Sequence, residues 1–139
     1  MLNTALIVLS TSYFTWYYTQ FETSAIYPFD TTYATPSDAG APGLIEDRLA
    51  TDDGETLIVW RADAQPGKPT ILYFSGNAGG LKAPADRFRS LTQAGFGVIA
   101  PAYRGSSGST GMPDEQTLLN DARTIAAQMS EDAVILYGE

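Results

Sequence analysis

The chain has 139 residues, of which 44% are hydrophobic, so it is long enough for one packed domain and too apolar for general disorder. Its net charge is −8 with eight Lys and Arg, which argues against a nucleic-acid partner because phosphate binding needs clustered positive charge. Cysteine and histidine are both absent. Disulfides, a cysteine nucleophile and a Ser-His-Asp triad confined to these residues are therefore excluded, and no transition-metal site is expected.

The beginning of the chain has the composition of a membrane segment. Residues 1–21 carry no charged side chain, and residues 2–18 are rich in aliphatic and aromatic side chains. This length is close to the minimum for a membrane-spanning helix, and the aromatic cluster at 13–18 suits a lipid interface. We expect a membrane anchor through residues 2–18, with a signal peptide or a docked amphipathic helix as alternatives. Without an anchor, the protein is expected in the cell envelope or the cytoplasm.

The remaining chain has the pattern of one α/β domain. Residues 22–43 contain Pro and Gly punctuation and are typical of a linker. An Asp-Gly turn at 53–54 predicts a hairpin between the first two strands. Apolar strands and amphipathic helices then alternate, which predicts parallel pairing. The expected strands are 44–50, 56–61, 70–74, 97–103 and 133–137, and the expected helices are 83–94 and 113–129.

The stretch 71–80 is the most informative of the chain. Its first four residues are apolar without alternation, which predicts a strand that is covered on both faces. The turn that follows contains three glycines and Asn77, residues that tolerate positive φ and let backbone amides approach a ligand. A strand that ends in exposed amides is a typical place for an anion or oxyanion site in an α/β protein.

Several motifs in order resemble one family. Residues 73–79, Tyr-Phe-Ser-Gly-Asn-Ala-Gly, resemble the Tyr-Phe-His-Gly-Asn-Ala-Gly signature of BEM46-like, membrane-associated α/β-hydrolases, with Ser75 in place of the family's His. Residues 103–111 resemble the Tyr-Arg-Gly loop of the same group, and 135–139 resemble the strand before its nucleophile. The resemblance also covers 26–30, 51–60, 113–115 and 121–122. It implies the N-terminal half of an α/β-hydrolase fold over residues 44–139.

The resemblance also implies a function and its residues. Gly138 and Glu139 match the first two positions of the family's Gly-x-Ser-x-Gly elbow, and the acid and the histidine follow the serine in such enzymes. We therefore expect the N-terminal part of a serine hydrolase, ending before its nucleophile and inactive alone. The family implies ester or thioester hydrolysis of a small-molecule substrate, no cofactor, and the Asn77 amide as one oxyanion donor. A membrane-tethered binding module without catalysis, or a relic of such a gene, is the alternative.

Other residues have simpler interpretations. Ser75 as a nucleophile lacks a base, and Ser107 lies in what we expect to be a flexible loop. Arg104 is expected to form a structural ion pair, and acidic pairs such as 52–53 are expected in solvated turns. Neither glycine-rich loop has the spacing of a nucleotide-binding motif. Without the elements that follow in the family, strand 133–137 is expected to expose apolar side chains and a free edge, and the isolated chain to be poorly stable.

Overall fold

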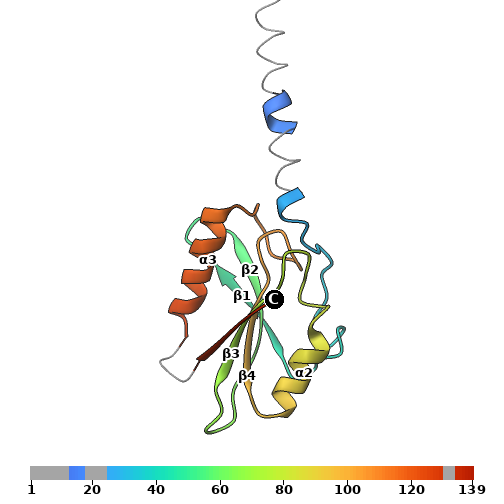
Figure 1. Ribbon diagram of the computed structural model, residues 1–139, viewed down its shortest axis with the longest axis vertical. Helices are drawn as coiled ribbons and strands as arrows, with labels where there is room; N and C mark the ends of the chain where they lie inside the picture. Colours follow the sequence, from blue (N-terminus) through green and yellow to red (C-terminus); the bar gives the residue numbers. More distant parts are fainter. Residues whose placement is uncertain (1–12, 18–24, 130–133) are drawn as a thin grey trace, which may run out of the picture.

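The computed structural model describes residues 13–17, 25–129 and 134–139. Five strands form one mixed sheet in the order β1-β2-β4-β3-β5, with helices packed against it (Figure 1). In chain order the elements are β1 (Ile45–Ala50), β2 (Thr56–Ala62), β3 (Thr70–Phe74), α2 (Ala85–Gln93), β4 (Gly97–Pro101), α3 (Glu115–Ala127) and β5 (Val134–Gly138). The predicted α/β class, with an antiparallel start, is confirmed.

The membrane prediction falls mostly on residues that the structure does not describe. Of residues 2–18, the described part is 13–17, which is helical and exposes four aromatic side chains. None of the helices within the described residues has the length and hydropathy that a bilayer crossing requires. The anchor therefore stays a prediction.

The hairpin forms as predicted. Strands β1 and β2 pair antiparallel, with Ala50 opposite Thr56 at the turn end. Gly54 has a φ of +89°, which favours glycine at this position. The Thr51 hydroxyl accepts a hydrogen bond from the Glu55 amide at 3.0 Å and closes the loop.

The three later strands run in parallel, also as predicted. β3 lies between β4 and β5 and is parallel to both, whereas β2 pairs antiparallel with the outer side of β4. The carboxyl ends of β3, β4 and β5 therefore meet at one edge of the sheet. In open α/β sheets, this is the edge at which ligands bind.

Helices α2 and α3 cover opposite faces of the sheet (Figure 1). On the α2 face, Phe88 is fully buried and makes edge-on ring contacts with Trp60 and Tyr73. On the α3 face, Ile125 packs in a second cluster with Leu72 and Leu57. Successive residues of β3 point to opposite faces, so burial on both sides explains its unbroken apolar sequence.

The structure corrects the predicted bounds of α3 and β4 and the predicted buried face of α3. Helix α3 begins at Glu115 rather than 113, because Asp114 is its N-cap and forms a capping box with Thr117. The sequence spacing predicts one buried apolar stripe on this helix, formed by Leu118, Leu119, Ala122, Ile125, Ala126 and Met129. This prediction is partly wrong, since Leu119 is exposed and Asp121 is buried. The strand predicted at 97–103 ends at Pro101, which has no amide to continue the ladder. The exposed apolar side chains predicted for β5 are present.

Candidate functional site

The candidate site lies at the carboxyl edge of the sheet, where three segments meet. The turn 75–80 follows β3, the loop 102–111 follows β4, and Glu139 follows β5. The Glu139 amide donates a hydrogen bond to the Phe74 carbonyl at 3.2 Å, which continues the pairing of β5 with β3. A Cβ on Gly76 would lie 3.6 Å from the Glu139 Cβ, so the end of β5 is in contact with the turn.

Hydrogen bonds fix both ends of the turn at residues 75–80, which we name the oxyanion turn after the role that the sequence predicts for it. At its start, the Tyr103 hydroxyl donates to the Ser75 carbonyl at 2.9 Å. After its end, the Leu81 amide donates to the Ser107 Oγ at 2.9 Å. Between these points, Asn77 and Ala78 are exposed residues whose amides make no hydrogen bond to any described residue. The turn therefore presents two adjacent backbone donors from a fixed frame.

The glycines of this turn matter for close approach and not for a positive φ. None of Gly76, Gly79 and Gly80 has a positive φ, so their tolerance for a left-handed backbone is not used here. Gly80 is required for close approach, because a Cβ there would lie 2.6 Å from the Ser107 Oγ and 3.3 Å from the Asp30 carbonyl oxygen. The absent side chain lets the loop after β4 lie directly against the turn.

The loop after β4 is buried, which corrects the expectation of a flexible loop. Ser106 and Ser107 are nearly inaccessible to solvent. The Ser106 hydroxyl and the Ser107 amide both donate to the Asp30 carbonyl, at 2.9 and 3.1 Å. Ser107 has a φ of +48°, an uncommon value for a residue with a side chain, and the two bonds to its amide and hydroxyl hold it there. Its hydroxyl is therefore placed to brace the oxyanion turn.

Aromatic stacking joins the N-terminal segment to the same edge. The Tyr103 ring stacks on Phe29 with centroids 4.9 Å apart and lies 6.5 Å from the Phe74 ring. The roles of Tyr103 and Asp30 were not predicted, because sequence pattern does not show which loop reaches which carbonyl. The local signal for Tyr103 was its place at the end of a buried strand.

Arg104 forms the expected ion pair, but with two carboxylates. Its Nε and Nη2 donate to both oxygens of Asp121 at 2.7 Å, and its Nη1 and Nη2 donate to Asp53 at 2.6 and 2.9 Å. The side chains of Arg104 and Asp121 are only 4% and 7% exposed. Hydrogen bonds from Arg104 and then from Thr51 hold the pKa of the Asp53 carboxyl well below its usual value. Asp53 lies in an exposed turn, as predicted, and its side chain is 51% exposed. The structure adds that this carboxylate joins the hairpin to the Arg104 network.

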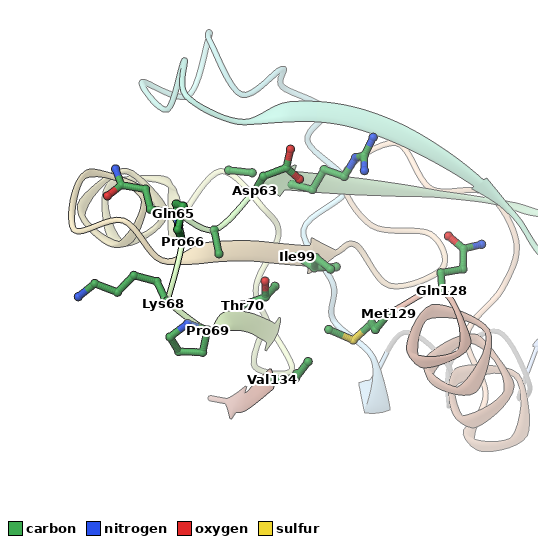
Figure 2. A pocket seen from close by; sticks show the side chains of 14 residues that line it. Asp63, Gln65, Pro66, Lys68, Pro69, Thr70, Ile99, Gln128, Met129 and Val134 are labelled. Atoms are coloured by element: carbon green, nitrogen blue, oxygen red, sulfur yellow. The ribbon is translucent and has the colours of Figure 1, made fainter. Parts of the chain in front are cut away.

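A separate hollow of about 800 Å³ lies at the opposite edge of the sheet. Figure 2 shows Thr70 at the start of β3, Val134 at the start of β5 and Met129 just after α3 among its lining residues. The backbone donors of the oxyanion turn are at the other ends of these strands. We therefore place the candidate site at the carboxyl edge, away from this hollow.

Comparisons with known proteins relate the chain to α/β-hydrolases. No family model matches the chain. The chain is 32% identical over 103 residues to protein bem46 of Schizosaccharomyces pombe, covering 66% of this chain and 34% of that protein. It is 32% identical over 85 residues to the α/β-hydrolase domain-containing protein WAV2 of Arabidopsis thaliana, covering 59% of this chain and 28% of that protein. The chain thus spans about a third of the length of these curated relatives.

A solved structure of an α/β-hydrolase from Vibrio vulnificus superposes with a TM-score of 0.67 at 18% sequence identity. The superposition covers 85% of this chain and 46% of that one. At this identity the superposition establishes the shared fold, and the evidence for common ancestry comes from the two sequence relatives.

Proposed function

Because the chain belongs to the BEM46-like group of the α/β-hydrolase superfamily, we propose that it supplies the oxyanion-binding part of a serine hydrolase that cleaves esters or thioesters. The observation that carries this proposal is the turn after β3, in which the Asn77 and Ala78 amides make no hydrogen bond to a described residue and Gly76 lies beside the end of β5. Amides in such a turn stabilise the negative charge that develops on a carbonyl oxygen during acyl transfer. No cofactor is required for this chemistry.

The nucleophile is proposed to follow Glu139 in the complete enzyme. A residue after Glu139 would emerge next to Gly76, because the Glu139 Cβ and carbonyl oxygen lie 3.6 and 3.8 Å from where a Gly76 Cβ would be. This is the place at which the family has its serine, and its own amide would be the second oxyanion donor. The acid and the histidine are proposed to follow the serine. Residues 1–139 alone are then expected to be inactive.

Labelling with a fluorophosphonate probe tests this proposal. The complete protein that the gene encodes is incubated with the probe and with nitrophenyl esters, and the labelled peptide is mapped. We expect ester hydrolysis and a labelled serine outside residues 1–139, and no label on a chain of residues 1–139. Label on Ser75 or Ser107, or the absence of both label and hydrolysis in the complete protein, would overturn the proposal. The second result would favour a binding module.

We propose in addition that residues 2–18 anchor the protein to a membrane. The support is the uncharged sequence up to residue 21 and the exposed Tyr13, Phe14, Trp16 and Tyr17. The test is cell fractionation with alkaline carbonate extraction, for the complete protein and for a variant that lacks residues 1–21. We expect the first to stay in the membrane pellet and the second to be released. Equal release of both contradicts the anchor.

A further inference from the structure

We propose that Arg87 is a positioning residue that holds the end of β5 against the oxyanion turn. Arg87 lies on α2, and its side chain reaches the start of the segment from which the nucleophile is proposed to emerge. Its Nη1 donates to the Glu139 carboxylate and, at 3.2 Å, to the Tyr73 hydroxyl. The inference rests on the proposed function, because it concerns the distance between the two proposed oxyanion donors. One donor is in the oxyanion turn, and the other is the amide of the proposed serine after Glu139.

The guanidinium lies over two stacked tyrosine rings. Tyr73 of β3 and Tyr137 of β5 are opposite each other in the sheet, and their rings are 5.2 Å apart and almost parallel. The Arg87 Cζ is 5.8 Å from the centroid of the Tyr73 ring and 5.4 Å from that of Tyr137. A planar cation interacts favourably with ring faces at these distances. One side chain of α2 therefore contacts two neighbouring strands at once.

Glu139 connects Arg87 to the oxyanion turn. Its carboxylate is bound by Arg87, its amide is bound to the Phe74 carbonyl, and its Cβ packs beside Gly76. The hydrogen bond from Arg87, with a smaller contribution from Tyr73, lowers the pKa of the Glu139 carboxyl and so stabilises its charged form. The last residue of the described chain is thus fixed through its backbone and its side chain.

The contribution of this pair to global stability is expected to be small. The side chains of Arg87 and Glu139 are 43% and 40% exposed, and exposed ion pairs stabilise proteins little. The expected effect is local, because a displacement of a catalytic group by about 1 Å can cost about 10²-fold in rate. Arg89, two residues along the same helix, pairs with Asp86 and with the Gly40 carbonyl instead, so it provides a matched control.

Kinetics of the complete protein test the positioning role. We expect Arg87→Gln to lower kcat for a nitrophenyl ester by about ten- to a hundredfold while KM and the melting temperature change little. Arg87→Lys should restore part of kcat, because an ammonium can pair with Glu139 but cannot lie over both rings as a guanidinium does. Glu139→Gln should not add to the effect of Arg87→Gln, since both remove the same link. Arg89→Gln should behave as the parent protein.

Hydrogen exchange tests, without depending on turnover, whether Arg87 holds the end of β5 against the oxyanion turn. Peptides covering 75–81 and 134–139 should exchange faster in Arg87→Gln than in the parent or in Arg89→Gln, while peptides of the β1–β2 hairpin should not change. Unchanged exchange in the two peptides would show that Arg87 does not hold these segments together. This result is independent of ester hydrolysis, so it can be read even if the proposed function fails. Faster exchange with an unchanged kcat in an active enzyme overturns the positioning role.

Discussion

Replacing Arg104 by methionine is expected to lower the free energy of unfolding by about 3–5 kcal/mol. The reason is Asp121, whose side chain is 7% exposed and whose two oxygens both accept hydrogen bonds from Arg104. Without the guanidinium, a buried carboxylate loses its cation and its strongest donors. The measurement is guanidinium chloride unfolding of the parent and variant proteins near pH 7.

Two further variants separate this explanation from a general loss of packing. Arg61→Met removes an ion pair with Asp47 whose side chains are about half exposed, and it should cost no more than about 1 kcal/mol. Adding Asp121→Leu to Arg104→Met should restore much of the lost stability, because the orphaned charge is then gone. A double variant that is no more stable than Arg104→Met contradicts the explanation.

The pH dependence of the same variant has a defined sign. Arg104 and Thr51 lower the pKa of the Asp53 carboxyl in the folded protein. The ionised Asp53 therefore contributes its full stabilisation of the folded state above the usual carboxyl pKa of about 4. It is lost as the pH falls toward the lower pKa of the folded state. The difference in stability between the parent and Arg104→Met should therefore narrow between about pH 5 and pH 2. A difference that stays constant over this range contradicts a carboxylate network.

Replacing Asn77 by proline is expected to lower kcat for ester hydrolysis by the complete protein about 10²–10³-fold. The prediction follows from the proposed function, in which the Asn77 amide donates to the oxyanion, and proline has no amide hydrogen. Loss of one oxyanion donor corresponds to about 2.7–4 kcal/mol of transition-state stabilisation. KM should change little, because the donor acts mainly on charge that develops in the transition state.

The neighbouring positions provide the controls for this prediction. Asn77→Ala keeps the amide and should retain most of kcat, since the exposed side chain of Asn77 has no proposed role. Ala78→Pro removes the second unbonded amide of the turn. If Ala78→Pro is impaired and Asn77→Pro is not, the donor is Ala78. If Asn77→Ala is as inactive as Asn77→Pro, the effect belongs to the side chain and the assignment of the amide is wrong.

The strands were predictable because their signals are local. The unbroken apolar run of β3 and the Asp-Gly turn before β2 indicate structure within a few residues, and both elements lie where the sequence predicts them. The error on α3 has the opposite origin. Its periodicity favoured Leu119 as a core residue, but a tertiary partner, Arg104, draws Asp121 into the interior instead. Periodicity records hydrophobicity and does not identify a distant cation.

The sequence by itself determined that this chain is an α/β protein with a glycine-rich turn after a buried strand, and its motifs were sufficient to indicate the family. The tertiary structure decided how that turn is held. Ser107 and Tyr103 brace it from the loop after β4, and Gly80 leaves the space for that contact. The physical reason is that these hydrogen bonds join residues 26 and 28 positions apart in the chain, where spacing along the sequence carries no information on distance in space.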